Sequence, residues 1–113
     1  MEVIYKKFNQ SETILVKQCM AYLDQIEITN FKHDNVPVRR YINRVKKGVP
    51  DIIAILPPHG KFVGIECKTK KGIQSDSQKQ FEIDSVSDGA IYLVIRDIME
   101  LVNYFKSFNQ SMT

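Results

Sequence analysis

The chain has 113 residues, of which 43% are apolar and 26% are charged, and its net charge is +3. This length is typical of one domain with a hydrophobic core, and no apolar run reaches the roughly 18 residues that a membrane helix requires. Because the N-terminal residues also lack a basic stretch followed by an apolar one, we expect a cytoplasmic protein without a secretory signal or a membrane span.

The first predicted helix begins at Ser11, a residue type that often caps helices, and runs to about Gln25. Glu12 lies in its first turn, on the side of the helix that carries Leu15 and Cys19. We therefore expect the Glu12 carboxylate to point toward the core, where a buried charge needs a partner. Apolar residues recur at helical spacing along this segment, at Leu15, Cys19, Tyr22, Leu23 and Ile26.

Extended segments follow the helix. Residues 26–33 (IEITNFKH) and 36–45 (VPVRRYINRV) are rich in β-branched and aromatic residues, although part of the second is equally compatible with a loop. After the interruption at Gly48 and Pro50, residues 51–56 (DIIAIL) predict a strand. Residues 57–60 (PPHG) then turn the chain, and residues 61–68 (KFVGIECK) return it as the second strand of a β-hairpin.

The last third of the chain predicts a helix, a buried strand and another helix. The first of these helices is capped at Ser75 or Asp76, and the strand covers residues 90–95 (AIYLVI). Asp97 with Glu100 forms a capping box that opens the last helix. The predicted order is α-β-β-β-α-β-α, and the fold class is α/β (α+β), a mixed sheet flanked by helices.

Two compositional features bear on partners and cofactors. Residues 32–72 contain ten of the sixteen Lys and Arg but only three of the thirteen Asp and Glu, a distribution typical of a surface that faces a polyanion. An ordinary solvated surface is the alternative. Cys19 and Cys67 belong to no CxxC pair, so we expect two buried, reduced core residues and neither a disulfide nor a structural zinc.

The hairpin suggests a catalytic site. Alternation along residues 61–68 places Glu66 and Lys68 on one face, and pairing across the turn brings Asp51 opposite them. Two carboxylates suit Mg²⁺ or Mn²⁺, with the backbone carbonyl of Cys67 as a further ligand and Glu12 as another, directly or through water. Lys68 is then placed to orient or deprotonate a water, or to stabilise a charged transition state.

Two other interpretations compete with a metal site. The first is a surface Glu66–Lys68 pair with Asp51 as a capping residue, which contributes little energy. The small Gly64 on the same face argues against it, because it leaves room for a ligand. The second is a glycosidase, whose two carboxylates bracket a sugar, but that chemistry requires neither the lysine nor the basic surroundings.

The sequence resembles a known nuclease signature. GVPD (residues 48–51), fourteen intervening residues, ECK (66–68) and then SDSQ (75–78) with Phe81 are similar to the PD-(D/E)xK motif, specifically that of the stand-alone virus-type replication-repair nuclease (VRR-NUC) family. The resemblance spans the chain from the first helix to the last. It implies a restriction-endonuclease-like core and Mg²⁺- or Mn²⁺-dependent cleavage of DNA.

The resemblance also implies roles for individual residues. Asp51 and Glu66 match the metal ligands, Lys68 the catalytic lysine, and Glu12 the acid of the first helix. Gln78 matches the family's glutamine, although SDSQ replaces the commoner Ser-Pro-X-Gln. Gln80 is a nearby competitor, and we prefer Gln78, since two residues so close on a helix point in different directions.

Stand-alone members of this family resemble Holliday junction resolvases, which act as homodimers. The resemblance therefore implies a homodimer that cuts branched DNA such as four-way junctions, and a phage origin is compatible with it. A flap-directed or single-strand-directed nuclease and a catalytically silent nucleic-acid-binding module are the alternatives. The basic block would hold backbone phosphates, with contacts expected from Arg39, Arg40, Arg44, Lys46, Lys47, Lys70 and Lys71.

Overall fold

The computed structural model describes residues 11–33 and 47–112 of the chain, with side chains up to Phe108. The predicted extended segment of residues 36–45 lies outside the described residues, as do Arg39, Arg40, Arg44 and Lys46. The described elements follow the order helix, three strands, helix, strand, helix. They are α2 (Glu12–Gln25), β1 (Thr29–Lys32), β2 (Ile52–Leu56), β3 (Lys61–Cys67), α3 (Asp76–Ser87), β4 (Ile91–Ile95) and α4 (Ile98–Met112).

The four strands form one mixed sheet in the order β1-β2-β3-β4. β2 and β3 pair antiparallel across the turn at residues 57–60, which confirms the predicted hairpin. β1 pairs antiparallel with the other side of β2, whereas β3 and β4 run parallel. A parallel pair needs a crossover connection, and α3 supplies it. The predicted class, a mixed sheet flanked by helices, is confirmed.

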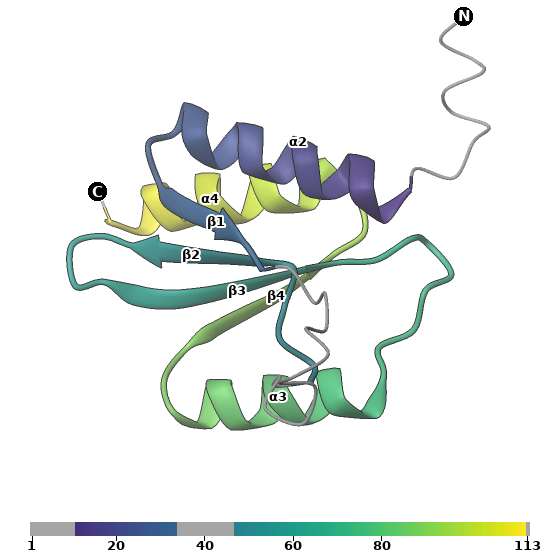
Figure 1. The fold of residues 1–113 in the computed structure, drawn as a ribbon. Helices are drawn as coiled ribbons and strands as arrows, with labels where there is room; N and C mark the ends of the chain where they lie inside the picture. The colour runs from purple at the N-terminus through teal and green to yellow at the C-terminus, as the bar shows by residue number, and fades with distance from the viewer. Residues whose placement is uncertain (1–10, 34–46, 113) are drawn as a thin grey trace, which may run out of the picture.

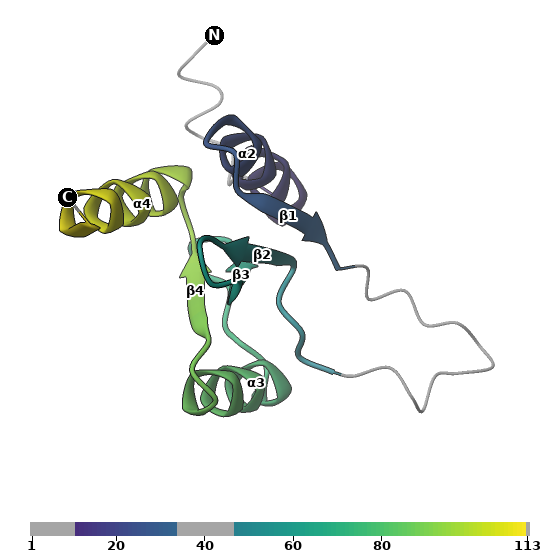
Figure 2. The same ribbon diagram turned by 90° about the vertical axis from the view of Figure 1, so that its left-hand side faces the viewer.

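Helices cover both faces of the sheet (Figure 1). α2 and α4 pack together on one face, and α3 lies on the opposite face, as Figure 2 shows. Because side chains alternate along a strand, every second residue of β2 and β3 points into the core beneath α2 and α4. No helix within the described ranges is long and apolar enough to span a membrane. The core contains Leu15, Cys19, Leu23, Ile52, Ala54, Val63, Ile65, Cys67, Leu101 and Phe105.

Local sequence signals explain where the helices begin. The Ser11 side chain accepts the N–H of Ile14 and caps α2, as predicted. Ser75, rather than Asp76, caps α3. At α4, the Glu100 side chain accepts the N–H of Asp97 at 3.0 Å, which is half of the predicted capping box. Each cap satisfies backbone N–H groups that the first turn of a helix leaves without partners.

Residues 48–50 pack tightly between α3 and the sheet and lead directly into Asp51. Gly48 has a φ of 81°, and a Cβ at this position would lie 2.2 Å from the carbonyl oxygen of Ser77. Pro50 is fully buried against Gly64, where an added Cβ would lie 2.7 Å from the Pro50 Cγ. The prediction that Gly64 leaves room for a ligand is therefore wrong, because Pro50 fills that space.

Candidate active site

Three of the five predicted catalytic residues, Asp51, Glu66 and Lys68, lie at one end of the sheet, where β2 begins and β3 and β4 end (right-hand side of Figure 1). Ile52 pairs with Ile65, so Asp51 stands one position beyond the ladder, across from Glu66. The Asp51 Oδ2 accepts the backbone N–H of Cys67 at 2.8 Å. The hairpin thus brings together two acids that are 15 positions apart in the sequence, as predicted.

Glu66 is a charged residue without any exposed surface. Its Oε1 accepts hydrogen bonds from the Tyr92 hydroxyl and from Gln74 Nε2, the latter at 3.3 Å. Its Oε2 is buried, accepts no hydrogen bond from the described residues, and lies 3.9 Å from the Nζ of Lys68. The interpretation of Glu66 and Lys68 as a surface pair is therefore wrong. A buried carboxylate oxygen that lacks a donor is costly, which is typical of an atom that serves a ligand.

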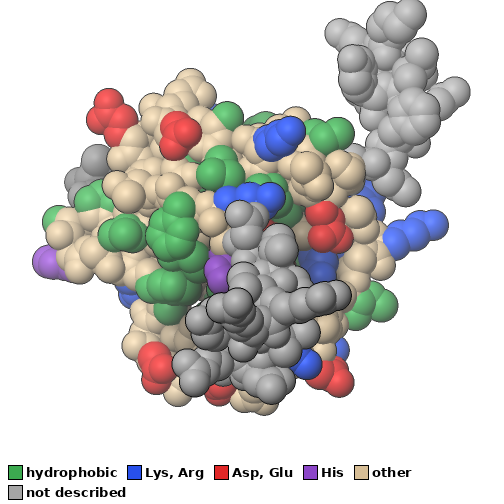
Figure 3. All heavy atoms as spheres, viewed as in Figure 1, with side chains coloured by type: hydrophobic (Ala, Val, Ile, Leu, Met, Phe, Trp, Pro, Cys, Tyr) green, Lys and Arg blue, Asp and Glu red, His purple; other side chains and the backbone are tan. Residues whose placement is uncertain are grey.

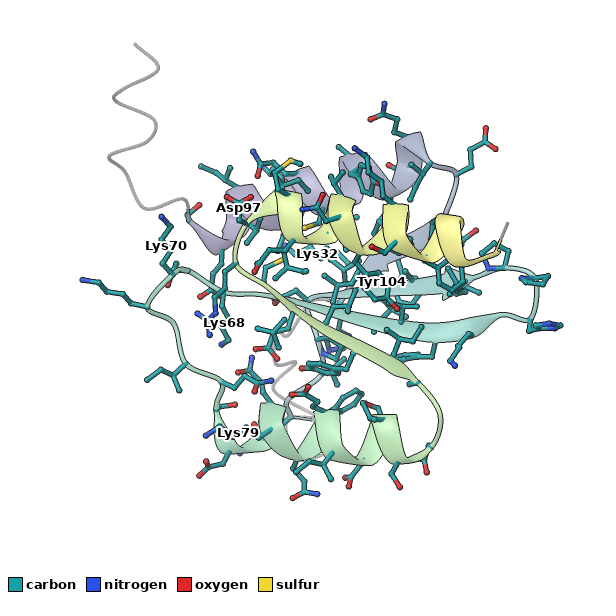
Figure 4. All side chains as sticks on the ribbon, turned by 180° about the vertical axis from the view of Figure 1, so that it is seen from behind. Lys32, Lys68, Lys70, Lys79, Asp97 and Tyr104 are labelled. Atoms are coloured by element: carbon teal, nitrogen blue, oxygen red, sulfur yellow. The ribbon has the colours of Figure 1, made fainter. Side chains whose placement is uncertain are left out.

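Asp51 lies in a half-buried, mixed electrostatic environment. Burial raises the pKa of this carboxyl group, and the nearby charge of Glu12 raises it further. The Cys67 N–H and the ammonium groups of Lys68 and Lys32 act in the opposite direction. Asp51 therefore has a carboxylate neighbour on α2 and lysine neighbours at the ends of β3 and β1, where Figure 4 labels Lys68 and Lys32.

Glu12 differs from its prediction. Its side chain is exposed at the first turn of α2 and does not point into the core. The charge of Glu12 nevertheless contributes to the raised pKa of the Asp51 carboxyl group. A residue in the first turn of a helix can lie at the margin of the core, where its side chain is exposed to water.

The structure does not bring Gln78 to the carboxylates. The side-chain oxygen of Gln78 accepts the backbone N–H of Ser75 at 2.8 Å, completing the capping box of α3. Gln80 is exposed and donates to Asp84 Oδ1 at 2.9 Å. Gln74, four residues before Gln78, is the glutamine that contacts Glu66.

Sequence reasoning missed two residues that contact Glu66, namely Gln74 and Tyr92. Gln74 donates to Glu82 Oε1 at 3.1 Å as well as to Glu66, so one amide links two carboxylates. Tyr92 reaches Glu66 from β4, packs its ring against Phe81, and has its pKa raised by burial and by the bond to Glu66. The alternation of β4 offered a signal for Tyr92, because it pairs with Gly64 on the Glu66 face. Gln74 lies in a loop, where no periodicity applies.

Comparisons of the chain with models of known families, with curated proteins and with solved structures find no match. The resemblance to VRR-NUC nucleases therefore remains a proposal that rests on the motif residues. Of the predicted DNA-binding residues in the described part, Lys47, Lys70 and Lys71 are all exposed. Cys19 and Cys67 are free and buried, as predicted, with their sulfur atoms 4.0 Å apart.

The donor set fits a hard divalent cation in part. Glu66 Oε2 has no hydrogen-bond donor, and Asp51 uses only Oδ2 to accept a hydrogen bond from the described residues. Oxygen ligands of this kind suit Mg²⁺ and Mn²⁺. Within the described ranges, however, no three His, Cys, Asp or Glu side chains are already grouped to hold a metal ion. A cation held by Asp51 and Glu66 would therefore need backbone, water or phosphate oxygens as well, which is common for Mg²⁺.

The raised pKa of Asp51 predicts a pH-dependent gain in stability for Asp51→Asn. The folded chain binds the Asp51 proton more tightly than the unfolded chain, so ionisation of Asp51 as the pH rises costs stability. The amide removes this cost, and its oxygen still accepts the Cys67 N–H. We expect the variant to unfold at higher temperature than wild type at neutral pH, with the difference shrinking as the pH falls toward about 4 and disappearing below it.

Thermal unfolding followed by circular dichroism across this pH range tests the prediction. Asp88→Asn is the control. Because Asp88 is exposed at the end of α3, its variant and wild type should not differ in unfolding temperature in this pH-dependent way. A variant of Asp51 that is less stable than wild type at neutral pH would contradict the assignment of burial as the dominant influence on this carboxyl group.

Proposed function

We propose that this chain is a metal-dependent, structure-selective DNA endonuclease of the VRR-NUC type, acting on branched DNA such as Holliday junctions. The observation that carries the proposal is Glu66, a fully buried carboxylate beside Lys68 and across from Asp51, with one oxygen that lacks a hydrogen-bond donor in the part of the chain that the structure describes. A purely structural glutamate at this depth would be expected to have both oxygens satisfied. Asp51, Glu66 and Lys68 of the resembling motif support the proposal, whereas the side chain of Gln78 is used in the capping box of α3.

The surrounding residues suit the task of presenting oxygen ligands. Tyr92 and Gln74 both donate to Glu66 Oε1, which fixes the carboxylate and leaves Oε2 for a ligand. The Cys67 N–H fixes Asp51 in the same way through Oδ2. Outer hydrogen bonds of this kind orient metal ligands in proteins. We propose Asp51 and Glu66 as the direct ligands, the Cys67 carbonyl as a third, and Glu12 as a ligand through water.

Lys68 supplies the remaining chemistry from the protein. Its side chain is only 12% exposed and its ammonium lies near Oε2 of Glu66, so it is held at the site. In the proposed reaction, Lys68 orients the attacking water or stabilises the negative charge that develops on the phosphate. Bound Mg²⁺ or Mn²⁺ would polarise the phosphodiester and lower the pKa of a bound water.

The choice of branched DNA and of a homodimer follows from the resemblance and from symmetry. One such site cuts one strand, and two sites related by a two-fold axis match a four-way junction. The basic residues between Lys32 and Gly72 would contact backbone phosphates, which favours recognition of DNA shape over sequence. The proposed location of this activity is the cytoplasm.

The test is incubation of the full chain with labelled four-way junctions, flaps, nicked duplexes and single strands in Mg²⁺, Mn²⁺ or EDTA. The mass of the protein in solution is measured in parallel. We expect cation-dependent cleavage that is lost in EDTA, and paired symmetric nicks in the junction from a dimer. Preferential cutting of flaps or single strands by a monomer would replace the junction assignment with a flap-directed or single-strand-directed nuclease of the same fold.

A catalytically silent nucleic-acid-binding module is the second candidate. The observation in its favour is that the described residues contain no ready group of three metal-ligating side chains. Such a module would bind DNA through its basic surface but would show no cleavage with either cation and no calorimetric signal for Mn²⁺. That combination of results would reject the endonuclease.

A further inference from the structure

Arg96 holds the loop that follows β3. It comes directly after β4, and its Nη1 donates to the carbonyl oxygens of Thr69 at 2.7 Å, Lys70 at 3.3 Å and Gly72 at 2.7 Å. The loop also closes on itself through the Gly72 N–H, which donates to the Thr69 carbonyl at 3.1 Å. One guanidinium from a neighbouring strand end therefore fixes the backbone of residues 69–72.

This arrangement is specific to arginine. The guanidinium is permanently charged and ends a side chain that is one bond longer than that of lysine, and its Nη1 alone makes the three carbonyl contacts. Backbone hydrogen bonds hold the start of the loop and Arg96 itself in place. The Lys68 N–H donates to the Ile95 carbonyl, and the Arg96 backbone N–H donates to the Glu100 side chain. Loops on protein surfaces are usually variable in shape, so this degree of fixation calls for a purpose.

The fixed loop carries a concentration of positive charge beside the candidate active site. Lys70 and Lys71 are exposed, Lys68 is at the site itself, and Arg96 adds its own charge beneath the loop. No Asp or Glu occurs between Glu66 and Asp76. Figure 4 shows Lys68 and Lys70 on the same side of the molecule, with Lys70 pointing outward, and Figure 3 shows Lys and Arg side chains projecting where this loop turns.

We propose that the 69–72 loop is a preformed binding surface for the backbone phosphates of the nucleic-acid strand that leads away from the cleavage site, and that Arg96 is the positioning residue that gives it its shape. A series of ammonium groups fits an acceptor-only polyanion, and exposed lysines contact phosphates without reading bases. Holding the loop in place before binding reduces the entropy lost on binding. This inference rests on the proposed function and adds the surface that engages its substrate.

The test measures DNA binding without cleavage, by fluorescence anisotropy with a labelled four-way junction in EDTA. Arg96→Lys keeps the charge, but its side chain is one bond shorter and does not place a donor where Nη1 lies, so we expect it to weaken binding about 5-fold, similar to Lys70→Ala. Combining Arg96→Lys with Lys70→Ala should weaken binding by less than the product of the two single effects, because both act through one surface. Lys106→Ala, which removes an exposed lysine of α4, should leave the affinity unchanged.

Hydrogen exchange, measured together with DNA binding, distinguishes a failure of the inference about Arg96 from a failure of the proposed nuclease function. Arg96→Lys should speed exchange of the Gly72 amide while the amides of β2 and β3 stay protected, which also shows that the variant is folded. If wild type binds the DNA but Arg96→Lys binds equally well with a loosened loop, the inference is overturned and the proposed function stands. If wild type does not bind the junction at all, the proposed function fails.

Discussion

The Glu66→Gln substitution should reduce cation-dependent DNA cleavage by at least about 10²-fold without lowering the stability of the fold. The amide keeps the shape of the side chain and an oxygen that can accept from Tyr92 and Gln74. It removes the negative charge that the proposed cation needs. It also removes a buried charge whose Oε2 has, among residues 11–33 and 47–112, only the ammonium of Lys68, 3.9 Å away, as a partner.

Stability is the informative second measurement. Burying a carboxylate costs several kcal/mol before compensation, and the Lys68 ammonium keeps the nearby Asp51 carboxylate as a partner, so the neutral variant should unfold at the same denaturant concentration as wild type or at a higher one. We expect calorimetric binding of Mn²⁺ to weaken together with cleavage. Glu82→Gln is the matched control, because Glu82 shares the Gln74 amide with Glu66 and yet has no proposed role in cation binding. Full cleavage by Glu66→Gln would remove Glu66 from the site.

The Gly48→Ala substitution should destabilise the fold by about 3 kcal/mol or more. The added Cβ would lie 2.2 Å from the Ser77 carbonyl oxygen and 2.8 Å from the Gln78 nitrogen, and all the closest atoms belong to the backbone of α3. A helix backbone cannot yield as a flexible side chain can. The positive φ of 81° adds the strain that any residue with a Cβ meets in this region.

The Gly89→Ala substitution separates the effect of the steric clash from the effect of the positive φ. Gly89 also has a positive φ, of 99°, but a Cβ there would meet nothing within 4 Å. Its destabilisation should therefore be limited to backbone strain, about 1 kcal/mol, as measured by urea unfolding of both variants. Equal losses in the two variants would mean that the contact between Gly48 and α3 is unimportant. Because residues 48–50 lead into Asp51, the Gly48 variant should also lose cleavage.

Much of this fold was predictable because its signals are local. Ser11 and Ser75 mark helix starts, since their side chains satisfy the N–H groups of the first turn. The proline-rich turn at residues 57–60 separates two apolar runs of suitable length, so the hairpin and its register across the turn could be deduced. The same register placed Asp51 opposite Glu66. Local chemistry alone determines each of these features.

The remaining features depend on contacts between distant segments. Arg96 and the 69–72 loop are separated by more than 20 positions, and a lone arginine after a strand gives no signal of its carbonyl partners. Gly64 was predicted to leave open space, but the packing of Pro50 onto it became visible only in three dimensions. Gln78 matched the motif, yet its amide is used by the helix cap, whereas Gln74 contacts Glu66. Sequence spacing cannot distinguish such competing uses of one side chain.

Cys67 contacts both the hydrophobic core and the candidate active site. Its thiol lies 4.0 Å from that of Cys19 on α2, and the hydrogen bond with Cys19 together with burial raises the pKa of the Cys67 thiol. The N–H of the same residue orients Asp51. A larger residue at position 19 would push on Cys67 and thereby displace the Asp51 carboxylate, which is proposed to be catalytic. Substitutions that aim to raise thermal stability should therefore leave Cys19 and Cys67 unchanged.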